Sequence, residues 1–390
     1  MSTQSASSIL FTHTSPQQGF KLLELPPELA DLLTSKEAPT LELKSPNPQQ
    51  TTTTTDLENH EYVNLCTPTK TYLVRQVQSS NSIHIIRPSD SGVQRGDINI
   101  VGGDDDGELN LVETMTAIAK CGSTLELHTP PEGFSAVPVL ERILPVYDEV
   151  EGAEQQQKEE EERRGDVIRR VFADVPVSLA QCEAGWIELC AFVLGRGGSG
   201  EDVAGWCRRP SARVKLDVWR RLLEGAVLQG IDLGKQFLVQ DLWRSVLDEG
   251  EESFPKALFE GVVRRVCEVG VGRLFEDLKW ASIDRARCTQ WVGETYLEAM
   301  APTTASGIGR SEFLNAWKDL LPESWRNDVA FSKLTENSYK HPDPTTICFV
   351  YRTDRQKIKK NVSTDASAAT AAKKTRNWHE LFKNQKRQKR

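Results

Sequence analysis

Hydrophobic and polar residues alternate with a period of two in the N-terminal third of the chain. Five short stretches show this alternation: residues 41–44, 72–75, 82–85, 98–100 and 125–127. Each stretch predicts a strand with one buried and one solvated face. Residues 1–128 are therefore expected to form a β domain, with one short helix over residues 111–120.

Two polar, low-complexity segments interrupt this domain. Residues 46–56 contain five consecutive threonines, and residues 102–107 contain three aspartates. Both compositions predict loops in solvent. Asp104, Asp106 and Glu108 resemble the start of a calcium loop. The glycine at the sixth position and the closing glutamate of such a loop are missing, so a solvated acidic turn is expected.

The hydrophobic period becomes helical from residue 134 onward. A first helix is expected over residues 138–147, and the acidic run at 148–162 predicts a solvated insertion or a helix extension. A second helix begins after Ser178, because Ser178 and Gln181 have the spacing of a capping box, and stops at Gly195. Its buried face is expected to carry Leu179, Cys182, Trp186, Leu189, Cys190 and Val193.

Two further helical units follow along the chain. In the second unit, apolar positions predict helices over residues 216–227, 239–247 and 258–267. In the third unit, one helix contains Ile283, Trp291 and Leu297, and another is capped by Ser311 and ends at Pro322. A third helix over 325–335 and a hairpin ending in the alternating residues 347–351 complete this unit. Three helices followed by a hairpin is the layout of a winged helix, so three such units in series are expected.

Charge is distributed unevenly between the body and the C-terminal end. The chain has a formal net charge of −8, but residues 355–390 contain 12 Lys or Arg and 2 Asp or Glu, a local charge of +10. The remainder therefore carries −18. A basic tail on an acidic body indicates a partner such as nucleic acid or an acidic protein surface.

The basic side chains of the tail fall into three clusters. They are Lys357, Lys359 and Lys360; Lys373, Lys374 and Arg376; and Lys383, Lys386, Arg387, Lys389 and Arg390. Between the last two, Trp378, Leu381 and Phe382 have the spacing of a short amphipathic helix that docks on a surface. A nuclear import signal is the alternative, and one segment can serve both purposes.

Residue patterns that carry chemistry are weak in this chain. Gly195, Gly197 and Gly200 match a dinucleotide fingerprint in spacing, but they follow a helix instead of a strand, so nucleotide binding is not indicated. The phosphate-binding loop of ATPases is missing, and the six histidines form no recognisable catalytic pattern. No catalytic, cofactor-binding or metal-binding residues are expected, and the chain is not predicted to be an enzyme.

Eight cysteines are scattered without a Cys-x-x-Cys pair or a histidine at zinc spacing, which predicts buried, reduced thiols. They are Cys66, Cys121, Cys182, Cys190, Cys207, Cys267, Cys288 and Cys348. No signal peptide and no membrane span are recognised. The sequence therefore predicts a protein of the cytosol or nucleus.

Several motifs resemble the Dcc family, whose members are "defective in sister chromatid cohesion" subunits of a replication-factor-C-like complex. The N-terminal motifs occupy residues 20–29, 63–72, 74–77 and 80–82. Residues 175–178 with Cys182, Trp186, Glu188 and Leu189 resemble the family's first winged helix. The last winged helix is matched by Phe313, Trp317, Leu320, Leu321, Pro322 and Trp325.

This resemblance implies an assembly domain followed by contact modules. The β region is similar to one that forms a shared barrel with a small chromosome-transmission-fidelity subunit and the C-terminus of the large ATPase subunit. The winged helices resemble ones that contact the catalytic subunit of DNA polymerase epsilon and DNA, and the complex acts on the sliding clamp PCNA. The resemblance implies a nuclear location, no cofactor and no membrane partner.

The predicted fold is therefore α+β. A β-barrel-type assembly domain (1–128) precedes a first winged helix with an acidic insertion (129–195) and a Gly-rich linker (196–204). Two more winged helices (205–272 and 273–353) and a basic, largely disordered tail (354–390) follow.

The third winged helix supplies candidate contact residues on its last helix and its hairpin. They are Arg326, Lys333, Lys340 and Arg352, followed by Arg355. Such side chains meet DNA phosphates or acidic patches on a polymerase, and a plain solvated face is the alternative. A winged-helix, sequence-specific DNA-binding regulator is the rival function. Acidic residues in the candidate recognition helices, such as Glu260 and Glu336, argue against that rival.

Overall fold

The computed structural model describes residues 10–45, 63–88, 114–148, 161–194, 207–247, 253–267 and 274–355. Internal contacts divide the chain into two compact units. The sheet unit contains residues 1–135 and 174–181, and the helical unit contains residues 136–173 and 182–390. Residues 174–181 thus belong to the sheet unit although 38 residues of the helical unit precede them in the chain.

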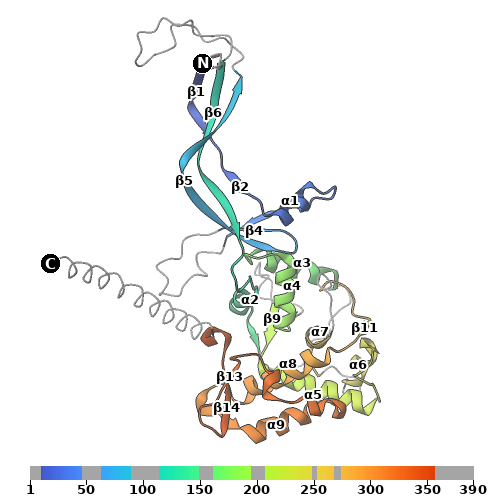
Figure 1. Ribbon diagram of the computed structural model, residues 1–390. Coiled ribbons are helices and arrows are strands. Elements are labelled where there is room, and N and C mark those ends of the chain that lie inside the picture. The colour runs from blue at the N-terminus through green and yellow to red at the C-terminus, as the bar shows by residue number, and fades with distance from the viewer. Residues whose placement is uncertain are drawn as a thin grey trace, which may run out of the picture. The chain divides into compact units, whose positions relative to one another are not determined.

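A six-stranded sheet forms the sheet unit, with the strand order β1-β6-β5-β4-β3 and with β2 also paired to β6 (Figure 1). β1 and β2 run parallel to β6, and the other neighbours are antiparallel. The strands are β1 (Leu10–Gly19), β2 (Leu22–Glu24), β3 (Glu42–Lys44), β4 (Val63–Cys66), β5 (Thr71–Pro88) and β6 (Thr114–His128). Within the described residues this sheet stays open, so the expected barrel is not closed there.

The two longest strands correct one expectation. Residues 111–120 were expected to form a helix, but β6 begins at Thr114 and continues to His128. It pairs with β5 from Leu73 opposite His128 to Pro88 opposite Met115, with two register shifts between them. Pairing over this length outweighs the local helical pattern of residues 114–120, because strand preference depends strongly on cross-strand neighbours. Four of the five expected strands are confirmed: 41–44 corresponds to β3, 72–75 and 82–85 lie within β5, and 125–127 lies within β6. The fifth, at 98–100, lies outside the described residues.

A small apolar core joins β4 and the start of β5 to one helix. α1 (Pro27–Thr34) begins with proline in its first turn, where a missing N–H costs nothing. Leu29 of α1 packs with Leu65 of β4 and Tyr72 of β5, and all three are buried. This core fixes the β4–β5 turn between residues 66 and 71.

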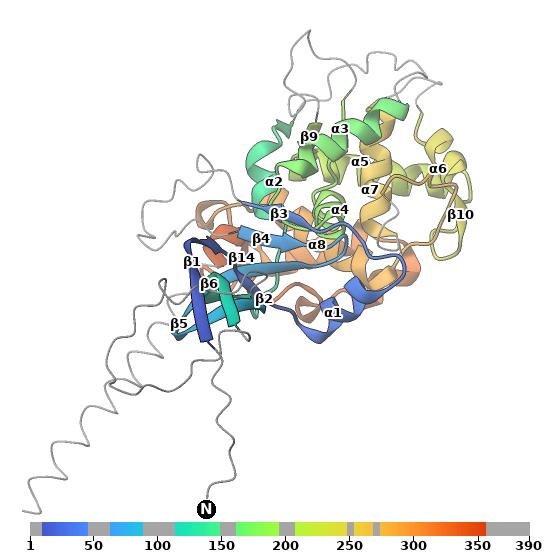
Figure 2. The same ribbon diagram turned by 90° about the horizontal axis from the view of Figure 1, so that it is seen from above.

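In the helical unit, a similar order of elements recurs three times with variations: a helix, a short strand, two or three more helical segments, and one or two closing strands. The first set is α2 (Val137–Ile143), β7 (Val146–Tyr147), α3 (Glu161–Ala173), α4 (Leu179–Glu188), β8 (Phe192–Val193) and β9 (Cys207–Pro210). The second is α5 (Ala212–Leu228), β10 (Phe237–Leu238), α6 (Val239–Ser245), α7 (Lys256–Val266) and β11 (Trp280–Ala281). α7 lies beside α5 and α8 (Figure 2).

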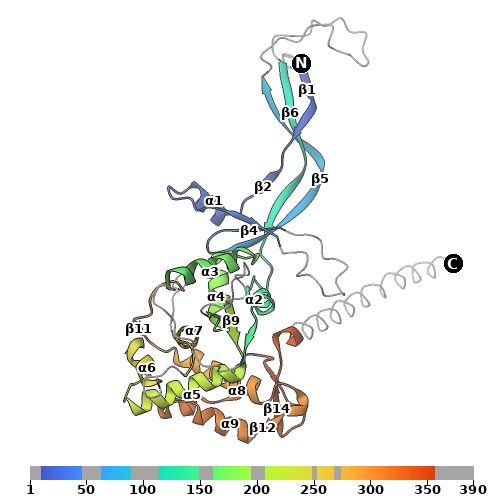
Figure 3. The ribbon, with the colours of Figure 1, turned by 180° about the vertical axis from the view of Figure 1, so that it is seen from behind.

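The third set contains α8 (Arg285–Met300), β12 (Ile308–Gly309) and α9 (Arg310–Asp319), followed by two 3-10 helices and a hairpin. The remaining elements are η5 (Thr304–Ser306), η6 (Glu323–Asp328), η7 (Phe331–Lys333), β13 (Tyr339–Lys340) and β14 (Thr346–Phe349). Figure 3 shows α9 beside β12 and β14. The strand order is β12-β14-β13, and both pairs are antiparallel.

Three expectations about these helices are corrected. The helix expected over 325–335 is replaced by η6 and η7, since Pro322 and the polar residues after it support only short turns. Ser311 lies inside α9, whose cap position is Gly309. The helix after Ser178 ends at Glu188 instead of running to Gly195, and Cys190 just beyond it has a φ of 53°. Leu179 is 41% exposed, so it lies off the buried face of that helix.

One buried cluster of the helical unit includes residues from Cys190 to Cys348. Trp219 of α5 and Trp317 of α9 are 1% and 0% exposed, and their indole N–H groups donate to the carbonyl oxygens of Leu320 and Thr289, each at 2.8 Å. These bonds satisfy the polar end of each ring inside an apolar core. Residues on both sides of position 272 therefore share one core.

Candidate interaction surfaces

The outer edge of β5 is the first surface with interaction chemistry. β4 pairs with residues 71–74 of β5 and no further. From Arg75 to Pro88, no described strand pairs with that edge, whereas the other edge is bound to β6. A strand with one unpaired edge presents backbone N–H and C=O groups that another chain can pair with.

Exposed isoleucines follow this edge. Ile83, Ile85 and Ile86 are 46%, 45% and 50% exposed. Elsewhere in the sheet unit Leu43 is 70% exposed. β-Branched side chains at an open strand edge favour burial against a further strand. The edge and its side chains therefore have the properties of an assembly surface.

The β4–β5 turn is the second surface with interaction chemistry. It binds residues 174–181, which are called the strap below. Thr67 shapes the turn, because its hydroxyl oxygen accepts from the Lys70 N–H at 2.8 Å and its own N–H donates to the Lys70 carbonyl at 2.8 Å. The Pro68 carbonyl then accepts from the Ala180 N–H at 3.0 Å. The turn thus bonds directly to the backbone of the strap.

Polar side chains on β3, β4 and β5 bind the strap as well, and those of Asn64 and Thr71 are buried. The Asn64 amide donates to the Pro176 carbonyl at 2.6 Å, and the Lys44 ammonium donates to the Val177 carbonyl at 3.2 Å. The Thr71 hydroxyl accepts from the Ser178 N–H at 2.7 Å. Because these groups have little exposure, each bond replaces one that the backbone would otherwise make to water.

The strap and the helix that follows share one capping arrangement. Gln181 accepts from the Thr71 hydroxyl at 2.5 Å and from the Ser178 N–H at 3.3 Å. The Ser178 hydroxyl in turn accepts from the Gln181 N–H at 3.3 Å, so the predicted capping box is confirmed. The start of α4 is therefore fixed by residues of the sheet.

The strap changes the interpretation of one motif. Residues 175–178 were assigned to the first winged helix, but they belong to the sheet unit and have little exposure there. The motif at 63–72 supplies Asn64 and Thr71, which bind Pro176 and Ser178. Sequence reasoning missed this role because the partners are more than 100 positions apart, as with Asn64 and Pro176.

The C-terminal basic residues divide into two groups. Arg326, Lys333 and Lys340 are exposed, and they lie on η6, η7 and β13. These three side chains are placed where a partner can reach them.

Arg352 and Arg355 instead make contacts within the helical unit. Arg352 forms an ion pair with Glu188 at the end of α4. Arg355 donates to the Val350 carbonyl at 2.8 Å, and its guanidinium lies 5.3 Å from the centre of the Phe349 ring. Burial lowers the pKa of Arg355, while Glu294 and Glu298 oppose that change. The basic residues of the tail, from Lys357 to Arg390, lie outside the described residues.

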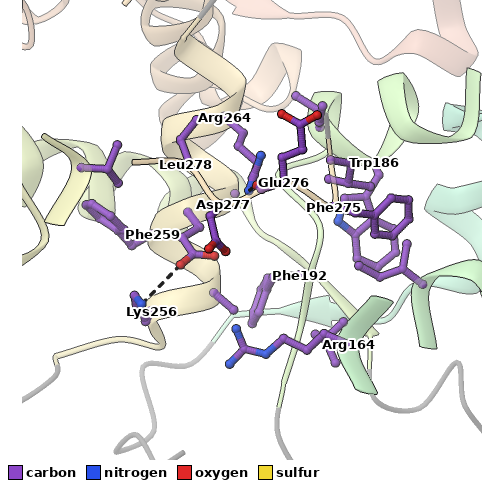
Figure 4. Close-up of a pocket in the computed structure, with 18 of the residues that line it drawn as sticks. Arg164, Trp186, Phe192, Lys256, Phe259, Arg264, Phe275, Glu276, Asp277 and Leu278 are labelled. Carbon is purple, nitrogen blue, oxygen red and sulfur yellow. Dashed lines mark hydrogen bonds and ion pairs between the residues drawn. The ribbon is translucent and has the colours of Figure 1, made fainter. Parts of the chain in front are cut away.

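The third candidate site is a cavity of about 910 Å³ in the helical unit (Figure 4). α3, α4, β8, α6, α7 and residues 274–280 contribute to its wall. Phe192 and Phe259 are buried in this wall, whereas Trp280 is 56% exposed. No sequence pattern indicated this cavity, because its walls come from separate segments of the chain.

The eight cysteines are buried thiols. None of them is joined in a disulfide, and all are buried, as predicted. Burial raises the pKa of Cys66, Cys190, Cys288 and Cys348, and it raises the pKa of Cys207 to about 12. Within the described ranges, no group of His, Cys, Asp or Glu side chains gathers as metal ligands do. The same ranges contain no helix long and apolar enough to cross a membrane.

Comparison with models of protein families gives a match over most of the chain. The family model described as "Sister chromatid cohesion protein Dcc1" matches residues 20–355. A search of curated proteins gives no match. The matched range includes β5, the strap, the cavity and the exposed basic residues.

Proposed function

Because the chain belongs to the sister chromatid cohesion protein Dcc1 family and so has a role in sister chromatid cohesion, we propose that it is a non-catalytic subunit of an alternative replication-factor-C-like clamp loader. This complex acts on PCNA in the nucleus, and its ATPase chemistry belongs to other subunits. The chain links the complex to the catalytic subunit of DNA polymerase epsilon and to DNA.

The open edge of β5 is the observation that carries the assembly role. Fourteen residues, 75–88, have no described partner on one side. Long exposed edges are usually blocked in proteins that act alone, because they pair with other chains. A strand from the small chromosome-transmission-fidelity subunit, joined by the C-terminus of the large ATPase subunit, would complete a barrel here.

The assembly role is tested by placing charge on this edge. Ile83→Lys/Ile85→Lys puts two ammonium groups where a partner strand must pack, and both side chains are already half exposed, so the fold tolerates them. We expect co-purification with the small subunit to fall at least tenfold. Val227→Lys/Leu228→Lys is the matched control, because these residues are 73% and 82% exposed on α5. Normal binding by the Ile83/Ile85 variant would exclude this edge as the assembly surface.

The helical unit is the proposed contact module for polymerase and DNA. Its recurring order of a helix, a short strand, further helical segments and closing strands supports three tandem winged helices. The first departs from the usual pattern, because β7 and β9 are parallel. The exposed Arg326, Lys333 and Lys340 are the proposed contacts, together with the tail. Arg352 and Arg355 support this face from within, through Glu188 and Phe349.

Two variants separate the polymerase from DNA as partners. Arg326→Glu/Lys333→Glu/Lys340→Glu should abolish polymerase binding, whereas Lys36→Glu/Lys120→Glu, which reverses exposed charges in the sheet unit, should not. Deletion of residues 356–390 should remove most of the salt-sensitive DNA affinity. Each lost phosphate contact lowers the slope of log K against log salt by about 0.9 on duplex DNA. Normal polymerase binding by the triple variant would refute the proposed docking face.

The rival function, a sequence-specific DNA-binding regulator, is less well supported. Such a protein places a recognition helix in the major groove. In the third module the corresponding residues form η6 and η7, which contain six and three residues. Short 3-10 segments present few side chains in a row, so base reading by this module is disfavoured.

A further inference from the structure

The edge of β5 between Ile83 and Pro88 is regular enough for a second strand to pair along it. Every residue of this stretch has a partner on β6, so the backbone is held extended. β4 pairs with β5 only at residues 71–74, and no described strand pairs with the stretch from its outer side. Its outward N–H and C=O groups are therefore available to another strand.

The same stretch lacks the features that usually prevent a strand from pairing with its own copies. Residues 81–86 contain no Lys, Arg, Asp, Glu or Pro, and half of them are isoleucine. These isoleucine side chains, Ile83, Ile85 and Ile86, are each about half exposed. Short, uncharged segments of high β-propensity without proline pair readily with identical segments. The composition of the edge therefore selects a second copy of the chain as its occupant.

Geometry limits how two identical copies of β5 can pair. A symmetric pair of identical strands is antiparallel, and residues directly opposite each other point to the same face of the sheet. Side chains alternate between the two faces along a strand. Each residue can therefore oppose only a residue an even number of positions away, so the symmetry axis passes through a residue and not between two.

Side-chain chemistry favours His84 as the centre of the pairing. With the axis at His84, Ile83 lies opposite Ile85 of the second copy, and symmetry repeats this contact, so two isoleucine pairs form. With the axis at any of the isoleucines, only one such pair forms. Cross-strand pairs of β-branched side chains stabilise a sheet. The register centred on His84 is therefore the one that the sequence of the edge supports best.

In this register, charged side chains of the two copies stay apart. Arg87 lies opposite Asn81 of the second copy, so the two Arg87 side chains are about 20 Å apart along the strands at about 3.4 Å per residue. Arg75 lies outside the overlap and forms an ion pair with Glu126 at 2.7 Å. We propose that, without a partner subunit, the chain forms a two-fold symmetric dimer in which the β5 edges pair antiparallel about His84.

The experiment places charge at the centre of the pairing. His84 is exposed, so His84→Lys and His84→Glu should fold normally, and their circular dichroism spectra should match that of the unchanged chain. In a dimer of either variant, two like charges lie directly opposite each other, which destabilises the pairing. Sedimentation velocity of the full chain at micromolar concentrations should show a dimer for the unchanged chain and at least tenfold weaker association for each variant. Gln76→Lys is the matched control, because Gln76 is exposed on β5 outside the overlap, and this variant should still dimerise.

An equimolar mixture of the two variants separates symmetric pairing from a general effect of charge. Lysine then faces glutamate at the axis, so the dimer should return. A monomeric unchanged chain, association of either variant alone at unchanged affinity, or a mixture that stays monomeric would each overturn the proposal.

The inference rests on the proposed function in one respect, because the small subunit is proposed to bind the same edge. Adding the small subunit should replace the dimer by a complex with one copy of each chain. A complex that keeps two copies of this chain would place the second copy elsewhere and overturn the proposal. Failure of the small subunit to bind would refute the assembly role alone, because dimerisation is measured without it.

Discussion

Removal of one hydroxyl from β5 should release the strap from the sheet. Thr71→Val keeps the shape of the side chain but deletes an oxygen that is 0% exposed. That oxygen accepts from the Ser178 N–H at 2.7 Å and donates to Gln181 at 2.5 Å. A buried donor left without a partner costs about 1–3 kcal/mol. The Ser178 N–H retains a longer bond to Gln181 at 3.3 Å, so the lower half of that range is expected.

Amide hydrogen exchange measures this opening directly. A loss of about 1–2 kcal/mol in the strap corresponds to exchange about 5 to 30 times faster in a peptide covering residues 174–181. Amides in the core of the helical unit, such as those of α8, should keep their rates. Thr69→Val is the control, because Thr69 lies exposed in the same turn, where a substitution changes stability by about 0.5 kcal/mol or less. Unchanged exchange at residues 174–181 in Thr71→Val would show that the hydroxyl does not hold the strap.

Four other outcomes follow from the structure. Trp317→Ala should lower the free energy of unfolding by about 3–5 kcal/mol in urea melts, because the ring is fully buried; a change below about 1 kcal/mol would contradict its place in the core. Gly293→Ala should also destabilise, since its Cβ would lie 2.5 Å from the Trp317 ring, and equal melting temperatures would mean that the ring moves aside freely. A thiol reagent at neutral pH should label none of the eight cysteines before unfolding, and rapid labelling of any would show that it is accessible. Hydrogen bonds from Thr345 and Thr346 lower the pKa of Asp343. The ionised carboxylate should therefore stabilise the β13–β14 turn at pH values above the ordinary pKa of Asp, and this contribution should be lost as the pH falls through the lowered pKa. Hydrogen exchange at the Thr345 and Thr346 amides that does not change with acid, compared with Asp343→Asn, would count against this prediction.

Local patterns were sufficient for several of the helices and strands of this chain. Period-two alternation located β3, β5 and parts of β6, and helical periodicity located α5, α6, α7 and α8. The capping box at Ser178 was correct in detail because its two partners are three residues apart. Interactions between residues this close in the sequence can be recognised from the sequence alone, without knowledge of the fold.

Long-range interactions explain what the sequence did not reveal. Residues 114–120 form part of β6 because β5 pairs with them from far along the chain, which no local window contains. The strap's partners and the cavity wall are likewise assembled from distant segments. Among the basic residues, the sequence could not distinguish exposed Lys333 from Arg352, whose partner Glu188 lies 164 positions away.

The strap also sets an order of events during synthesis. Residue 181 is made 53 residues after the end of β6. At about 5–20 residues per second, the ribosome takes roughly 3–10 seconds to cover that distance. Throughout this interval the nascent sheet has all its strands but lacks the segment that covers Asn64 and Thr71. A chaperone or an early partner therefore meets a sheet whose Asn64 and Thr71 side chains are still exposed. This interval ends when the strap binds and α4 begins to form.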